Sequence, residues 1–235
     1  MREELSRLGL LLGEKGLDRL AGARVAVFGL GGVGGHAAEA LARSGVGSLS
    51  LFDADTVAPS NLNRQLVALK SSIGRPKAEA LAERLADAAP GCAVVPYVVF
   101  YGPENADEYP MSDYDFVLDA VDNVTAKLTL LTRCAAAGVP AVTCMGTGNK
   151  LHPERLRLGP LEKTETCPLA RVMRRECRKR GLKNVMAVWS DEPPLPPLER
   201  VTGENGKSVP GSTAFVPAAA GLLMASYAVR CLAGV

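Results

Sequence analysis

Apolar residues along the chain follow two alternating periods, one typical of strands and the other typical of helices. Residues 25–28 form a short apolar run, glycines follow it, and a helical pattern begins near Val33. A second apolar run then ends at Asp53. This order of strand, glycine turn, helix and strand within 24–55 predicts a β-α-β unit with two parallel strands.

The same alternation continues through the middle of the chain. Repeated β-α-β units form sheets whose strands are mostly parallel and whose two faces are covered by helices. The pattern therefore predicts an α/β, Rossmann-like fold with a mostly parallel sheet and helices on both faces. We expect helices at 77–88 and 126–137, and strands at 93–100, 116–119 and 141–144.

The last third of the chain has a different composition. Residues 168–180 form a basic segment with a helical pattern. Residues 191–211 are rich in proline, glycine and charge, which predicts an exposed, mobile loop. We therefore expect one domain over 1–235, in which 164–212 form a substrate-binding insertion made of the basic helix and the loop.

The two ends of the chain and its cysteines bear on the cellular location of the protein. The run at 215–235 is apolar but interrupted by Pro217 and Arg230, which favours a helix closing the core over a membrane span. The first residues are charged and helical in pattern, unlike a secretory signal. The six cysteines form no C-x-x-C pair, so we expect reduced thiols and a cytoplasmic location.

Bulk numbers set only broad limits. A chain of 235 residues that is 47% hydrophobic can bury a sizeable core. The net charge of +2 is too small to indicate a nucleic-acid partner by itself. The distribution of charge is more informative, because basic residues crowd into 168–183.

The glycine turn carries the first candidate chemistry. Gly29, Gly31 and Gly34 form a G-x-G-x-x-G fingerprint directly after a strand, and Asp53 follows the next strand, where it can reach a ribose hydroxyl. Glycines let the backbone approach a phosphate, and the helix N-terminus offers unpaired N–H groups. On this unit alone a redox dinucleotide is favoured over ATP.

Polar residues after the second strand shift the balance toward ATP. Asn61, Asn63, Arg64 and Gln65 are suited to hold a triphosphate through charge-assisted hydrogen bonds, although a helix cap at Asn61 would also explain part of the cluster. Lys77 begins the next helix and would add positive charge near the same phosphates. Its alternative is a solvated helix lysine.

Two aspartates follow the strand at 116–119. Asp119 ends that strand and Asp122 lies three residues later. Mg²⁺ prefers one or two carboxylates together with phosphates and waters, so the pair predicts a magnesium site beside ATP. A strand end at Asp119 and a helix N-cap at Asp122 form the structural alternative.

Together these motifs resemble the ubiquitin-activating-type adenylating family, which includes the molybdopterin-synthase and thiamine-pathway adenylyltransferases. The matching pieces are GLGGVG at 29–34, DADTVAPSNLNRQ at 53–65, GRPKAE at 74–79 and LDAVDN at 118–123, in the family's order. The resemblance implies ATP and Mg²⁺ as cofactors and adenylation of a carboxylate. It implies that ATP is bound by Gly29, Gly31, Gly32, Gly34, Asp53, Asp55, Asn61, Asn63, Arg64, Gln65, Lys77, Asp119 and Asp122.

The resemblance also implies roles in catalysis. Asn61, Arg64 and Lys77 would hold the phosphates, and Asp122 would hold the magnesium ion or the adenylate. Family members are usually homodimers in which an N-terminal arginine reaches the ATP of the partner subunit, and Arg7 occupies the corresponding place. A solvated helix arginine is the alternative for Arg7.

Three further segments are LGLLLGEKGLDRLAGARVAVFGLGGVGG at 8–35, PLARVMRRECRKRGLKNV at 168–185 and WSDEPP at 189–194. They resemble the family branch that dehydrates threonylcarbamoyladenosine in tRNA to its cyclic form. There the threonyl carboxylate is adenylated and the neighbouring carbamoyl group displaces AMP, so no catalytic cysteine is needed. Cys167 stands where an acidic residue is expected in this branch, and His36 replaces a small residue. The resemblance implies tRNA binding by Arg171, Arg174, Arg175, Arg178, Lys179, Arg180 and Lys183.

Other functions remain open from the sequence. One is activation of a small ubiquitin-like sulfur-carrier protein at its C-terminal carboxylate, and a sulfur-transfer protein is a possible partner in either case. More distant alternatives are an NAD-binding oxidoreductase and a non-catalytic tRNA-binding module.

Overall fold

The protein is built on a seven-stranded sheet in the strand order β3-β2-β1-β4-β5-β7-β6. The computed structural model describes residues 3–199, 201–202, 206 and 208–235. All neighbouring strands are parallel except β6 and β7, which pair antiparallel. The strands are β1 (Arg24–Phe28), β2 (Ser48–Phe52), β3 (Ala93–Tyr97), β4 (Phe116–Asp119), β5 (Ala141–Cys144), β6 (Leu156–Pro160) and β7 (Met186–Ser190).

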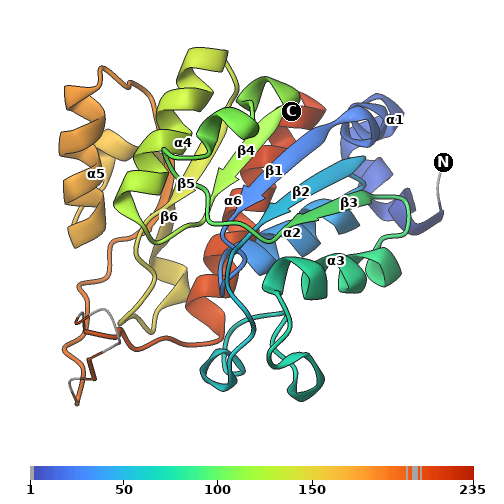
Figure 1. The fold of residues 1–235 in the computed structure, drawn as a ribbon. Coiled ribbons are helices and arrows are strands. Elements are labelled where there is room, and N and C mark those ends of the chain that lie inside the picture. Colours follow the sequence, from blue (N-terminus) through green and yellow to red (C-terminus); the bar gives the residue numbers. More distant parts are fainter. Residues whose placement is uncertain (1–2, 200, 203–205, 207) are drawn as a thin grey trace.

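Helices cover both faces of the sheet (Figure 1). One apolar core joins α1, α2, α3 and α6 to the inward residues of β1 and β2, such as Val25 and Leu49. The opposite face packs against α4 and α5. The Rossmann-like prediction is therefore confirmed. The helices are α1 (Ser6–Gly22), α2 (Gly34–Arg43), α3 (Lys77–Ala88), α4 (Val124–Ala137), α5 (Pro168–Lys179) and α6 (Phe215–Ala233).

Two strands near the C-terminal side were missed by the sequence analysis. β6 and β7 flank α5, and β7 pairs with β5 inside the sheet. The segment 164–212 thus contains a core strand as well as the basic helix. The loop predicted at 191–211 has no helix or named strand among its described residues, and residues 200, 203–205 and 207 of that prediction lie outside the described residues.

Element ends differ from the predictions at two places that matter for the site. β3 ends at Tyr97, so residues 98–100 leave the sheet earlier than expected. α4 begins at Val124 because Asn123 caps it, with Oδ1 accepting a hydrogen bond from Ala126 N at 3.0 Å. The cap is therefore Asn123 and not Asp122.

α6 is long and apolar enough to cross a membrane by length and composition alone. In the structure it packs on α2 and the sheet, and residues along it such as Val216, Met224 and Ala228 are fully buried. A helix that closes the core of an α/β domain passes the same composition test, and this packing favours that interpretation.

Candidate functional site

A cleft opens where the strand order of the sheet reverses. The chain moves from β1 to β2 on one side and later enters β4 on the other, so the loops after β1 and β4 separate at the carboxyl ends of the strands. Open α/β sheets bind ligands at this point. The cleft has a volume of about 390 Å³, and its walls come from the glycine loop, the segment after β2, residues 99–101 and the turn before α4.

Two positions of the glycine loop have room for glycine only. Gly29 has φ +84°, and a Cβ there would lie 2.7 Å from Ala120 O. A Cβ on Gly34 would lie 1.8 Å from Gly29 O. Gly29, Gly31 and Gly32 line the cleft, whereas Gly34 lies behind the loop and permits its tight closure.

α6 supports the glycine loop from behind. A Cβ on Gly32 would lie 3.1 Å from Pro217 Cβ. A Cβ on Gly221 would lie 2.3 Å from Val33 O, at the start of α2. The glycine loop is therefore held in place by a helix from the other end of the chain.

Asp53 lies in the cleft wall at the end of β2. Its Oδ2 accepts a hydrogen bond from Leu30 N at 2.6 Å, and its Oδ1 accepts one from Asp55 N at 2.8 Å. Burial raises the pKa of the Asp53 carboxyl, while the charge of Lys77 and the two N–H donors oppose the shift. The carboxylate is fixed in orientation beside the glycine loop, as a ribose-binding acceptor must be.

Lys77 enters the same cleft from the first turn of α3. Its side chain is 6% exposed and its Nζ lies 2.6 Å from Asp55 Oδ2, whereas the side chain of Asp55 is 72% exposed. The backbone of Lys77 also donates to Asp55 O at 2.9 Å. The ammonium is thus held in the cleft by a partner that water can reach.

Asn61, Arg64 and Gln65 follow on the loop after β2, and all three line the cleft. Arg64 Nη1 donates to Ser60 O and to Asn63 Oδ1, both at 2.9 Å. Gln65 is buried, and its Oε1 has no hydrogen-bond partner in the described part of the chain. An unpartnered buried acceptor in a cleft wall is costly unless a ligand or water reaches it.

Asn63 is placed differently from its neighbours. It does not line the cleft, and its Nδ2 donates to Ser212 O at 3.0 Å. It therefore ties the loop that carries Arg64 to the segment before α6.

Asp119 and Asp122 are separated by the structure. Asp119 is fully buried, lies outside the cleft wall and accepts hydrogen bonds from Lys127 Nζ and from Thr143 Oγ1, the latter at 2.6 Å. Asp122 is exposed and lines the cleft. Of the two aspartates expected to face ATP, only Asp122 lines the cleft. Asp119 instead forms a buried ion pair with Lys127.

The residues present fit a magnesium ion only as part of a nucleotide complex. The described residues contain no cluster of three or more histidine, cysteine, aspartate or glutamate side chains that could hold a metal. Mg²⁺ beside nucleotides takes one or two carboxylates and completes its shell with phosphates and water. Asp122 supplies a carboxylate of that kind at the rim of the cleft.

Arg7 lies far from the cleft of its own chain. It is exposed on the first turn of α1. The neighbouring Leu5 touches Gly45, where a Cβ would lie 2.6 Å from Leu5 Cδ1. Gly45 follows the C-terminus of α2, and the glycine loop precedes its N-terminus, so the ten-residue helix of about 15 Å separates them.

The basic residues predicted to bind tRNA lie on α5 and on the turn that follows it. Buried Ala170, Met173 and Cys177 attach the helix to α4 and the sheet, so its basic side chains face solvent. Arg175, Lys179 and Arg180 share the carboxylate of Glu176, and Arg180 lies nearest at 2.9 Å. These three donors lower the pKa of Glu176 to about 2. Arg174 instead bonds Thr164, and Arg171, Arg178 and Lys183 have no ion pair among the described residues.

One wall of the cleft contains none of the predicted site residues. Val99, Phe100 and Tyr101 line it, beyond the early end of β3. The Tyr101 ring meets Phe28 edge-on with centroids 4.8 Å apart, and burial raises the pKa of its hydroxyl to about 12. The side chain of Asn105 holds this turn through Gly102 N and Phe100 O, both at 3.0 Å. The adjacent aromatic residues Phe100 and Tyr101, shortly after β3, are a signal in the sequence for this wall.

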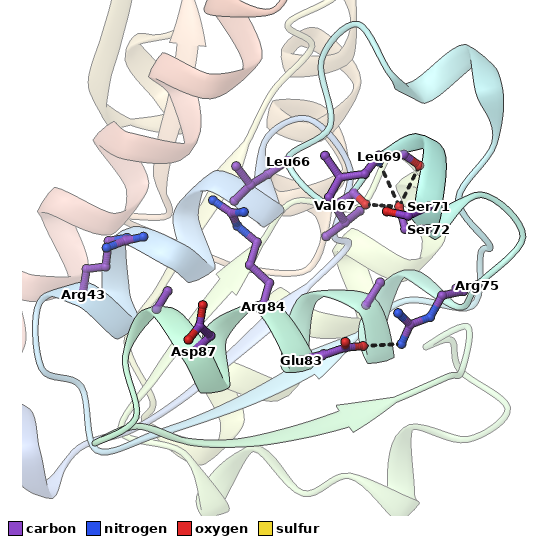
Figure 2. A pocket seen from close by; sticks show the side chains of 12 residues that line it. Arg43, Leu66, Val67, Leu69, Ser71, Ser72, Arg75, Glu83, Arg84 and Asp87 are labelled. Carbon is purple, nitrogen blue, oxygen red and sulfur yellow. Dashed lines mark hydrogen bonds and ion pairs between the residues drawn. The ribbon is translucent and has the colours of Figure 1, made fainter.

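A second hollow, of about 540 Å³, lies between α2, α3 and the loop before α3 (Figure 2). Its arginines are already paired: Arg43 and Arg84 with Glu39, and Arg75 with Glu83 at 2.5 Å. None of the predicted site residues lines it. The candidate chemistry therefore belongs to the smaller cleft.

Comparison with known proteins covers nearly the whole chain. The sequence model of the ThiF family matches residues 5–235. The chain is 41% identical to a tRNA threonylcarbamoyladenosine dehydratase of Bacillus subtilis (strain 168) over 242 positions, which cover 99% of this chain and 95% of that protein.

Solved structures give the same picture. The crystal structure of the E. coli tRNA N6-threonylcarbamoyladenosine dehydratase in complex with ATP has a TM-score of 0.90 and 34% identity, covering 99% of this chain and 95% of that chain. The molybdopterin-synthase adenylyltransferase of Escherichia coli (strain K12) is 38% identical over 128 residues, only 54% of this chain and 51% of that protein.

Proposed function

The chain belongs to the ThiF family, and on this premise we propose that it is an ATP-dependent tRNA threonylcarbamoyladenosine dehydratase. The observation that carries the proposal is the extent of similarity. The Bacillus subtilis and E. coli dehydratases match 99% of the chain, including α5 and β7. The molybdopterin-synthase adenylyltransferase matches only 54% of the chain.

In the proposed reaction a carboxylate oxygen of the threonyl group attacks the α-phosphorus of ATP and pyrophosphate leaves. The neighbouring carbamoyl group then attacks the activated carbonyl carbon, and AMP departs with that carboxylate oxygen. The loss of this oxygen and two protons equals the loss of water. No enzyme nucleophile is required, which agrees with the burial of Cys134, Cys144 and Cys167.

The residues of this chain would act mainly by position and charge. Asp53 would accept from a ribose hydroxyl, and the backbone of Gly29, Gly31 and Gly32 would lie against the phosphates. Lys77 and Arg64 would offset the negative charge that builds on the phosphates during attack. Gln65 Oε1 and Asn61 add amide groups to the same wall.

A magnesium ion, when bound with ATP, would neutralise phosphate charge and make pyrophosphate a better leaving group. Asp122 is the residue that would hold it, because its carboxylate is exposed at the cleft rim and the helix cap is provided by Asn123. Asp119 has no part in this role.

We also propose that the chain works as one domain over 1–235 and forms a homodimer. Arg7 lies about the length of α2 from its own cleft, so it can reach ATP only in the partner subunit. The free cysteines favour a reducing cytoplasmic location.

The basic face of α5 would bind tRNA phosphates. Arg171, Arg178 and Lys183 lack ion pairs among the described residues, so they are the most available of the set. Such contacts are independent of sequence and weaken as salt rises.

One experiment tests the function. The protein is incubated with ATP, Mg²⁺ and tRNA carrying the threonylcarbamoyl base, and the nucleosides are weighed. We expect that base to lose one water with formation of AMP. Asp122→Ala should abolish AMP formation while tRNA binding stays intact. Unchanged nucleosides, with pyrophosphate exchange driven instead by a sulfur-carrier protein, would overturn the proposal.

A further inference from the structure

A groove lies beside the cleft on the outer face of α4. It is bounded by α4, by the turn that follows the cleft wall at 99–101, and by the C-terminal end of α5. Its volume is about 390 Å³, the same as that of the cleft, and within the range of small-molecule sites. We name it the α4 groove.

The α4 groove and the cleft share two structural elements. Tyr101 lines the cleft, whereas Pro103 and Ala106, on the same turn, line the groove. Asp122 lines the cleft, and Thr125, in the first turn of α4, lines the groove. The two hollows are therefore lined by neighbouring residues of the same two segments.

The lining of the groove has two chemical parts. Leu128 and Ala106 are 7% and 2% exposed and give an apolar floor. Thr125, Thr129 and Thr132 lie on one face of α4, at spacings of four and three residues. Thr129 Oγ1 donates to Thr125 O at 3.0 Å, which leaves its lone pairs free to accept from a ligand.

The far end of the groove is cationic. Arg133 pairs with Asp107, and Arg180 pairs with Glu176 at 2.9 Å. The Asp107 side chain is 95% exposed, so its pair with Arg133 exchanges readily with water or another anion. Lys179 shares Glu176 with Arg180, so one carboxylate faces more than one cation at this end.

This combination suits a single nucleotide of an RNA strand. A base can pack on an apolar floor or on a guanidinium plane, a ribose hydroxyl can bond to threonine, and a phosphate can pair with arginine. The groove is also continuous with the basic face of α5. A protein segment would use the apolar floor but has no need of the paired arginines at its end.

We propose that the α4 groove binds the nucleotide next to the modified adenosine, and so orients the substrate RNA while the threonyl carboxylate lies at the cleft. The inference rests on the proposed dehydratase function and names how its RNA substrate is recognised. Thr132 and Arg133 are the positions at which the groove can be changed without changing the cleft, because both line the groove and neither lines the cleft.

The test uses two variants of the full-length protein. Thr132→Tyr fills the groove from an exposed position, and Arg133→Gln removes its phosphate partner. Each should raise the KM for modified tRNA by about tenfold or more, the range that one stacked base contributes. The KM for ATP should change by less than about twofold. Arg43→Gln is the matched control, because it removes an ion-paired, exposed arginine in the other hollow (Figure 2).

A second measurement needs no variant. Modified tRNA with 4-thiouridine beside the modified adenosine is irradiated with the wild-type protein, and the cross-linked peptide is identified by mass spectrometry. Attachment within 103–106 or 124–137, two segments that line the groove, supports the inference. An unchanged KM for tRNA in both groove variants, or cross-linking only elsewhere, overturns it. If the wild type does not dehydrate the base at all, the proposed function fails instead.

Discussion

Two lysines of this protein meet aspartates near the carboxyl edge of the same sheet, in opposite surroundings. Lys77 is 6% exposed and pairs at 2.6 Å with Asp55, which is 72% exposed. Lys127 and Asp119 are both 0% exposed and pair at 3.1 Å. The lysines are similarly buried, so burial of the cation does not tell a binding lysine from a structural one.

The partners make the difference. Lys127 Nζ also donates to Thr143 Oγ1 at 3.1 Å and to Cys144 O at 2.7 Å, which joins α4 to β4 and β5 with no route to solvent. Lys77 has one side-chain partner, and that carboxylate can turn to water when a phosphate arrives. A cation in the cleft can change partners, whereas the cation in the core cannot.

Replacing the core lysine should have the largest effect on stability. Lys127→Met leaves the carboxylate of Asp119 buried without its charge partner, which we expect to lower the free energy of unfolding by about 3–5 kcal/mol. Urea denaturation measures the loss. Adding Asp119→Asn should recover part of it, and a single variant as stable as the wild type would erase the distinction between the two lysines.

Replacing the cleft lysine should separate activity from stability. Lys77→Met keeps a side chain of similar length, and Asp55 stays solvated, so we expect the free energy of unfolding to change by about 1 kcal/mol or less. AMP formation should slow by about 10²–10³-fold, because a preorganised charge near the phosphates is lost. The same denaturation assay and a single-turnover rate check both parts; a slow but strongly destabilised variant would contradict them.

Acid should weaken nucleoside binding through Asp53. Burial raises its folded pKa above the usual 3.8. An ionised carboxylate accepts a hydrogen bond from a ribose hydroxyl more strongly than a protonated carboxyl does, so affinity is retained above this raised pKa and falls as the pH drops through it. Adenosine is the best probe since it has no phosphate to titrate. The affinity of Asp53→Asn should be lower and flat over the same range; a parallel fall in both proteins would assign the effect to another group.

Replacing the acidic partner of the exposed ion pairs on α5 should have the smallest effect, and on tRNA binding only. Glu176 neutralises part of the basic face and stays ionised at working pH because its pKa is about 2. Glu176→Gln should therefore tighten tRNA binding a few-fold and steepen the dependence of log K on log salt by about one unit. Filter binding at several salt concentrations checks this. Stability should hardly move, and weaker tRNA binding would show that Glu176 orders the basic side chains instead.

The cleft could be predicted because its chemistry follows strand ends that are local in sequence. Glycines 29 to 34, Asp53 and Lys77 each lie within a few residues of an element end, so their meeting follows from parallel strands alone. Asp119 could not be placed this way. Its partner Lys127 had the appearance of an ordinary helix residue, and only the packing of α4 on β5 brings them together.

Other misses have the same origin. Asn63 is a polar residue next to predicted ligand-binding residues, but its side chain forms a hydrogen bond with Ser212, 149 positions away in the sequence. β6 and β7 are no shorter than the predicted strands β4 and β5, but their place in the sheet depends on the pairing of β7 with β5 and of β6 with β7. Tyr101 lines the cleft because β3 ends at Tyr97, three residues earlier than predicted. These features depend on long-range contacts that no local pattern records.

The backing of the glycine loop by α6 has a consequence for synthesis. Ribosomes deliver the loop around Gly32 early, and Pro217 and Gly221 follow only after most of the protein has emerged. Contacts so distant in sequence form late in folding, because closing the intervening loop costs entropy. A nascent chain would therefore hold a phosphate loop with nothing behind it. ATP capture should begin only when α6 leaves the exit tunnel, so nucleotide affinity of stalled chains would time the arrival of this helix.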